Sequence, residues 1–127
     1  MSKILLPAVL IASTLASAAF SQSGTPMTNE ELTALTANGV TLSLGGKGMG
    51  YTGELVLTAD GRGDGSATMD SGDKLSIAGT WAIKDGKFCR VWADLDGGKE
   101  VCETWIKKTD TSVEVYNGDQ MLGVNSW

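Results

Sequence analysis

The chain lacks histidine altogether and has only two cysteines among its 127 residues. Without histidine, Ser-His-Asp and Cys-His catalysis, histidine metal sites and the usual proton carrier near neutral pH are excluded. Carboxylate pairs, as in glycoside hydrolases, are the remaining catalytic option. The acidic residues are spread over turns, and none stands in an apolar context that would raise its pKa. The sequence therefore predicts a non-enzymatic protein, with a carboxylate-based hydrolase as the alternative.

Positive charge is also scarce, because 10 lysines and arginines face 15 aspartates and glutamates, for a net charge of −5. An acidic surface repels nucleic acid phosphates and anionic lipids, so no nucleic acid partner is expected. Residues 48–53 match the dinucleotide-binding pattern as a string, but a predicted strand follows where that pattern needs a helix. Residues 60–65 lack the closing glutamate of a calcium loop. No cofactor and no metal site are predicted.

Long apolar runs are absent except near the N-terminus. Lys3 precedes an apolar run over residues 4–15, and residues 16–18 have the small-x-small pattern of a cleavage site. This predicts a signal peptide over residues 1–18, cleaved after Ala18 or, as a second option, after Ala19. The run is short for a bilayer, so no membrane span is expected after cleavage, and an uncleaved membrane anchor is the alternative. The protein is predicted to be periplasmic or secreted.

The two cysteines, Cys89 and Cys102, predict one disulfide, since exported chains oxidise their thiols. A free-thiol or metal-binding role is the alternative. The cysteines fall on consecutive predicted strands, and pairing them would fix the register of those strands. The same register would also set two neighbouring cross-strand pairs, Arg90 with Val101 and Trp92 with Lys99.

One short helix is predicted over residues 29–37. Thr28 and Glu31 have the spacing of a capping box, and Asn38-Gly39 provides a left-handed stop. The small, polar residues 19–26 are predicted to be a flexible leader. Residues 27–127 then form a single β-rich domain.

After Gly39 the apolar period changes to two, and turn dipeptides separate about eight short strands. The predicted strands cover residues 40–44, 52–58, 62–69, 74–84, 87–95, 99–107, 111–116 and 120–124. No crossover helix separates them, so the pairing is expected to be an antiparallel meander. The predicted fold is mainly β: a small closed barrel with the helix over one end, or a partly open, strongly curled sheet. The 17 glycines favour the closed form, and Gly79 is expected to mark a bend or bulge.

A pattern across the C-terminal half carries a family resemblance. Its residues are Gly79-Thr80-Trp81, Asp85-Gly86, Cys89, Trp92 and Cys102. The pattern resembles a family of small exported proteobacterial proteins that is known only as a domain of unknown function. The resemblance implies a periplasmic or secreted β-rich domain, and it brings no activity or catalytic residues. Gly-Thr-Trp is also similar to the opening strand of lipocalins and avidins, but here it stands mid-chain, which leaves only an architectural analogy.

Three tryptophans, Trp81, Trp92 and Trp105, are predicted either to fill the core or to line a pocket. Arg90 alternates with Trp92, and Glu103 with Trp105. These two charges form either a surface salt bridge or a polar anchor in a ligand site. The predicted function is a small exported binding module that presents a tryptophan-lined pocket or rim to a small apolar ligand or a peptide.

The alternative function is that of a structural or interaction protein of the bacterial envelope, such as an accessory subunit or an inhibitor. Its contacts would come from an exposed sheet edge or from the glycine-rich loop that holds Met49 and Tyr51.

Overall fold

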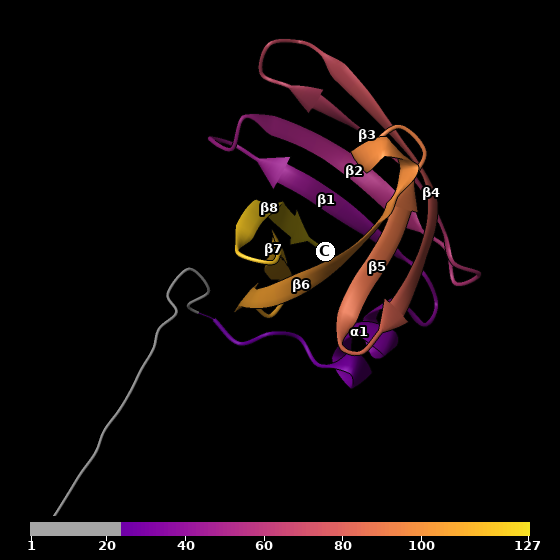
Figure 1. Cartoon of the computed structure of the whole chain (residues 1–127). Coiled ribbons are helices and arrows are strands. Elements are labelled where there is room, and N and C mark those ends of the chain that lie inside the picture. The colour runs from indigo at the N-terminus through magenta and orange to yellow at the C-terminus, as the bar shows by residue number, and fades with distance from the viewer. Residues whose placement is uncertain (1–23) are drawn as a thin grey trace, which may run out of the picture.

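The computed structural model describes residues 24–127, which fold into a closed barrel of eight antiparallel strands (Figure 1). Each strand pairs with the next along the chain, and the last pairs with the first. The elements are α1 (Asn29–Thr36), β1 (Val40–Gly46), β2 (Tyr51–Leu57), β3 (Arg62–Met69), β4 (Lys74–Lys84), β5 (Lys87–Trp92), the 3-10 turn η1 (Asp96–Gly98), β6 (Glu100–Thr109), β7 (Ser112–Asn117) and β8 (Gln120–Ser126). The predicted fold class is confirmed, in its closed form. The predicted signal peptide and residues 19–23 of the predicted leader lie outside the described residues.

Turn chemistry explains why the strands follow one another as hairpins. Between β4 and β5, Asp85 and Gly86 have φ angles of 50° and 76°, the left-handed conformation that a two-residue hairpin turn requires. The flanking Lys84 and Lys87 form the last pair of this ladder. Local connections of this kind produce the meander, and the pairing of β8 with β1 closes it.

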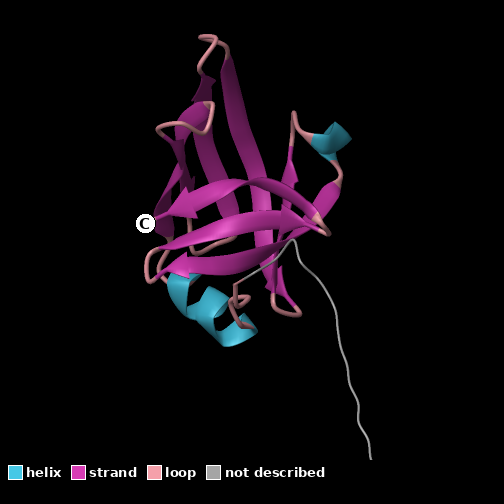
Figure 2. Cartoon of the chain, turned by 90° about the vertical axis from the view of Figure 1, so that its left-hand side faces the viewer, coloured by secondary structure: helices cyan, strands magenta, loops and turns pink. Residues whose placement is uncertain are grey.

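Helix α1 covers one end of the barrel (Figure 2). Its capping box is formed: the Glu31 amide donates to the Thr28 hydroxyl at 3.1 Å, and the Thr28 amide donates to Glu31 Oε1 at 2.9 Å. Leu32, on the covered face, is completely buried in the core. The Gly86 amide donates to Asn29 Oδ1 at 2.9 Å, which fixes the helix to the β4–β5 turn. A helix this short is stable only with such tertiary contacts.

The described part of the predicted leader is paired with the barrel, not free. Pro26 forms a bridge with Ile106, the Met27 amide donates to the Trp105 carbonyl, and the Lys107 amide donates to the Thr25 carbonyl, both at 2.8 Å. β5 pairs with β6 only from Glu100 to Glu103, so this segment satisfies the backbone of β6 where β5 no longer reaches it. The small, polar composition of the leader gave no sign of this pairing.

Glycines on the inner face of β3 and β4 make room for the indole of Trp92. A Cβ atom at Gly63 would lie 2.8 Å from the Trp92 ring, and one at Gly79 would lie 1.9 Å from the Val91 carbonyl oxygen. The pairing of β4 with β3 continues through Gly79 without a register shift, and the pairing of β4 with β5 begins at this residue. Of the predicted bend or bulge at Gly79, the bulge is therefore excluded, and the glycine allows the close approach of Val91 and Trp92.

The disulfide joins Cys89 and Cys102, as predicted, at a register position where the two residues are direct cross-strand partners. Arg90 faces Val101, also as predicted. Trp92 does not face Lys99, because the β5–β6 ladder ends one residue earlier. Phe88 and Arg90 line the barrel interior, so Cys89, between them in the strand, lies on the outer face of β5.

Removing the disulfide by the double substitution Cys89→Ala and Cys102→Ala is expected to lower the free energy of unfolding by about 3 kcal/mol, the usual contribution of a short closed loop. The crosslink restricts the unfolded chain, and alanine avoids burying a hydroxyl at position 89. Urea unfolding of the variant, compared with the wild type with and without a dithiol reductant, measures the effect. Equal midpoints in all three samples would show that the crosslink does not stabilise the fold.

Candidate functional site

A cavity of about 130 Å³ lies at the end of the barrel away from α1, which we call the open end. The turns β1–β2, β3–β4, β5–β6 and β7–β8 surround this end, since an up-and-down meander alternates its connections. The apolar walls include three aromatic rings, and Leu122 lines the cavity where it reaches the surface, with 38% of that residue exposed. The aromatic residues in the wall are Tyr51, Phe88 and Trp92. The polar residues in the wall are Arg90, Glu103 and Asn125.

Two of these polar side chains form a buried ion pair, and a second carboxylate, that of Asp96, also binds the arginine. Arg90 Nε donates to Glu103 Oε2 at 2.9 Å, and Arg90 Nη1 donates to Asp96 Oδ2 at 2.5 Å. Trp105 Nε1 donates to Glu103 Oε1 at 3.0 Å. The Arg90 and Glu103 side chains are only 8% and 9% exposed, whereas that of Asp96 is 47% exposed. One cation and two carboxylates therefore meet beside the cavity, and we call them the charge cluster.

Burial determines the electrostatics of the charge cluster. It raises the pKa of Glu103 above the ordinary 4.5, and the hydrogen bond from Trp105 and the charge of Arg90 only partly offset this. Burial also acts to lower the pKa of Arg90, but the hydrogen bond to Asp96 and the charge of Glu103 outweigh it, and the pKa of Arg90 is raised. The expectation that no acidic residue stands in an apolar context is therefore wrong at Glu103, because its neighbours come from strands distant in sequence.

The stability contributed by Glu103 is expected to fall as pH rises. A raised pKa in the folded state favours the protonated carboxyl, so this contribution is complete below 4.5 and is lost as pH rises through the folded-state pKa. Urea unfolding between pH 4 and pH 8 gives the free energy of unfolding of the wild type and of Glu103→Gln. The wild-type value minus the variant value should therefore be larger at pH 4 than at pH 7. A difference that stays constant or grows with pH would contradict the raised pKa.

Asp96 was not among the predicted site residues. It belongs to the β5–β6 connection, where its φ of 55° and those of Gly97 and Gly98, 66° and 73°, are all left-handed. Asp-Gly-Gly indicates a turn, which is what the sequence predicted. The only additional signal was that this turn joins the two strands that carry Arg90 and Glu103.

The structure separates the five predicted ligand-binding residues into two groups. Arg90, Trp92 and Glu103 line the cavity, whereas Trp81 and Trp105 do not. Trp81 packs on Phe88 with ring centroids 5.7 Å apart, and Phe88 packs on Trp105 at 4.8 Å. These contacts place Trp81 and Trp105 in the aromatic core toward the α1 end.

Of the two residues predicted to make contacts from the glycine-rich loop, one lines the cavity and the other does not. Met49 lies in the β1–β2 turn with 36% of its surface exposed, and it does not line the cavity. Tyr51 lines the cavity and helps to close the barrel: its hydroxyl accepts a hydrogen bond from the Val124 amide at 3.2 Å. Its ring lies over Gly45, and its hydroxyl lies over Gly123. The direct pairing of β1 with β8 covers only two residue pairs, so Tyr51 bridges the seam beyond them.

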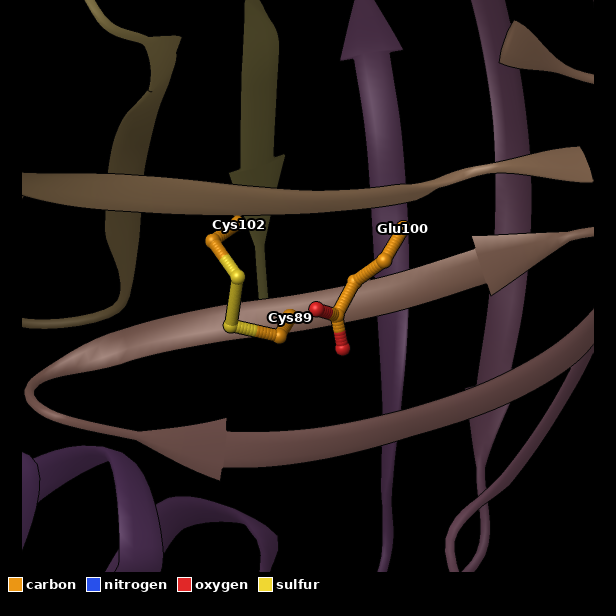
Figure 3. Close-up of side chains that lie close together, drawn as sticks. All are labelled: Cys89, Glu100 and Cys102. Carbon is orange, nitrogen blue, oxygen red and sulfur yellow. A yellow bond between two sulfur atoms is a disulfide. The ribbon is translucent and has the colours of Figure 1, made fainter. Parts of the chain in front are cut away.

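Within residues 24–127, one group of side chains has the composition of a metal site. The Cys89 and Cys102 sulfurs and the Glu100 carboxylate lie within 4.8 Å of one another, and Figure 3 shows Glu100 beside the disulfide. The two sulfurs are bonded to each other, so neither is a thiolate that could bind a metal. Glu100 pairs with Lys84 Nζ at 2.7 Å. This group is a crosslink with a neighbouring surface ion pair.

A second, wider hollow of about 400 Å³ lies outside the barrel, along residues 38–41 and 56–59. No charged or aromatic side chain lines it, whereas the open-end cavity combines both. Small-molecule sites usually join apolar walls to a few polar groups, so the open-end cavity is the better candidate.

Comparison with protein families, curated proteins and solved structures finds no match for this chain. In the part of the chain that the structure describes, no helix has the length and apolar character needed to cross a membrane. The fold and the site therefore define the class on their own: a small, disulfide-linked, antiparallel β-barrel with a cavity at one end.

Proposed function

We propose that the protein is a small binding module whose open-end cavity takes an apolar molecule about the size of one six-membered ring. The observation that carries this proposal is that Arg90, Trp92 and Glu103 converge on a cavity of about 130 Å³. An apolar cavity of about 150 Å³ in another protein is known to hold benzene. The module is non-enzymatic in this proposal, because the carboxylates beside the cavity are occupied: Glu103 accepts bonds from Arg90 and Trp105, and Asp96 accepts one from Arg90.

The cellular setting is part of the proposal. The disulfide supports an oxidising compartment, and therefore a periplasmic or secreted protein. The predicted signal peptide and the resemblance to small exported proteobacterial proteins point the same way.

Isothermal titration calorimetry with benzene tests the proposed site. Leu122→Asp places a charge at the mouth of the cavity and is expected to weaken binding at least about tenfold, or about 1.4 kcal/mol. Val56→Asp is the matched control, because Val56 is similarly exposed, at 41%, but lines the outer hollow. Unchanged affinity in Val56→Asp would support the proposal. Absence of benzene binding, or a loss confined to Val56→Asp, would contradict it.

A second candidate is an interaction protein of the bacterial envelope, which is favoured by three exposed apolar residues around the open end. Met49, Met121 and Leu122 are 36%, 42% and 38% exposed. Met49→Asp distinguishes the two functions, because Met49 does not line the cavity. An interaction protein would lose a captured envelope partner in Met49→Asp and keep it in Val56→Asp, whereas a binding module would keep its benzene affinity in both.

A further inference from the structure

The cavity wall contains hydrogen-bond donors that the protein does not use. Arg90 donates through Nε and Nη1, and among residues 24–127 no acceptor is bonded to its Nη2. The Tyr51 hydroxyl accepts a bond from the Val124 amide, and its own proton is donated to no described residue. Among residues 24–127, no hydrogen bond is formed by the Asn125 side chain, which also lies in the wall. Each of these three groups can donate to a ligand.

The carboxylate in the same wall is already engaged, and the Asn125 amide adds one acceptor oxygen to the three free donor groups. Glu103 uses one oxygen for Arg90 and the other for Trp105, at 2.9 Å and 3.0 Å. A bound ammonium group would need acceptors, and it would compete with Arg90 for the same carboxylate. The wall therefore suits a ligand that accepts hydrogen bonds better than one that only donates them.

The charge of the cluster restricts the acceptor further. Arg90 is paired with both Glu103 and Asp96, so with both carboxylates ionised the cluster carries one net negative charge. An ionised ligand carboxylate would add a second negative charge in a poorly solvated place, unless Asp96 moved away. A neutral carbonyl oxygen can accept from the free donors without that cost.

We propose that the open-end cavity is a site for small neutral carbonyl compounds, such as a cyclic ketone, lactone or lactam. The apolar ring packs against Trp92 and Phe88, and the carbonyl oxygen accepts from Arg90 Nη2, the Tyr51 hydroxyl or the Asn125 amide. This inference rests on the proposed function, because it assigns a ligand class to the same cavity.

The test compares four ligands of similar shape by calorimetry at pH 7: cyclohexanone, methylenecyclohexane, cyclohexylammonium and cyclohexanecarboxylate. Cyclohexanone should bind the wild type at least about tenfold more tightly than the carboxylate or the ammonium ion. Methylenecyclohexane replaces the carbonyl oxygen with a CH₂ group, so it reports apolar binding alone.

Two variants separate the hydrogen bond from the charge. Tyr51→Phe removes one donor and should reduce the affinity ratio of cyclohexanone to methylenecyclohexane about three- to tenfold, the usual effect of one hydrogen bond. Asp96→Asn makes the cluster neutral and should improve carboxylate binding relative to cyclohexanone. Thermal unfolding of each variant confirms that the barrel is folded before titration.

The outcomes distinguish the inference from the function on which it rests. Methylenecyclohexane that binds the wild type as tightly as cyclohexanone would overturn the ligand class and leave the binding module intact. Tighter binding of the carboxylate or the ammonium ion to the wild type would also overturn the ligand class. If neither benzene nor any of the four ligands binds, the proposed function itself fails.

Discussion

Replacing Arg90 with methionine is expected to lower the free energy of unfolding by about 3–5 kcal/mol at pH 7, the usual cost of removing one partner of a buried ion pair. Methionine preserves most of the apolar stem, so little packing is lost. The cost arises because Glu103, with 9% of its side chain exposed, loses its cation and must either stay ionised in a buried place or take up a proton. Urea unfolding at pH 7 measures this loss.

A second substitution and a change of pH both test the cause of that loss. In the double variant Arg90→Met with Glu103→Gln, no buried charge remains, so most of the lost stability should return. The loss in the single variant should also shrink toward pH 4, since protonation neutralises Glu103. An equally unstable double variant, or a loss that does not depend on pH, would show that Arg90 acts through packing and not through charge.

Replacing Trp92 with alanine is expected to lower the free energy of unfolding by about 3–5 kcal/mol, the range for deleting a large buried aromatic side chain. Trp92 is 4% exposed and fills the space above Gly63 and Gly79. Gly63 and Gly79 have no side chains that could fill the void, so the cavity at the open end should grow. Chemical denaturation measures the loss, and Trp81→Phe, at a partly exposed site outside the cavity, provides a control with a smaller effect.

The effect of a substitution on the opposite wall on stability should change sign with the residue at position 92. In the wild type, Gly63→Leu collides with the Trp92 ring, because even a Cβ atom would lie 2.8 Å from it, and overpacking costs about 1–3 kcal/mol. In the Trp92→Ala background the same leucine fills the void and should restore part of the stability. If Gly63→Leu is equally harmful in both backgrounds, Trp92 and Gly63 are not packing partners.

Local rules were sufficient to predict the strands of this barrel. Turn dipeptides such as Asp85-Gly86 delimit segments in which apolar residues alternate, and each segment pairs with the next because no crossover helix intervenes. The predicted disulfide fixed the β5–β6 register, which is why the pairing of Arg90 with Val101 is correct. Closure was favoured only by the abundance of glycine, so the sequence left a partly open sheet as the alternative.

The composition of the site could be predicted only in part, because closure of the barrel determines it. Arg90, Trp92 and Glu103 lie on two consecutive strands, and their alternation indicates a shared face. Tyr51 and Asn125 are distant in sequence and reach the same cavity only because β8 returns to β1. The burial of Glu103 has the same origin, since the alternation with Trp105 indicates a shared face but not that the closed barrel buries it.

Observation of the tryptophan indole N–H signals by ¹H–¹⁵N NMR during a benzene titration would show where a ligand binds. The indole signal of Trp92 should shift and saturate with rising benzene concentration, because only this tryptophan lines the cavity within the described chain. The signals of Trp81 and Trp127 should remain in place. A Trp92 signal that does not move, or four signals that drift together without saturating, would contradict a ligand site at the open end of the barrel.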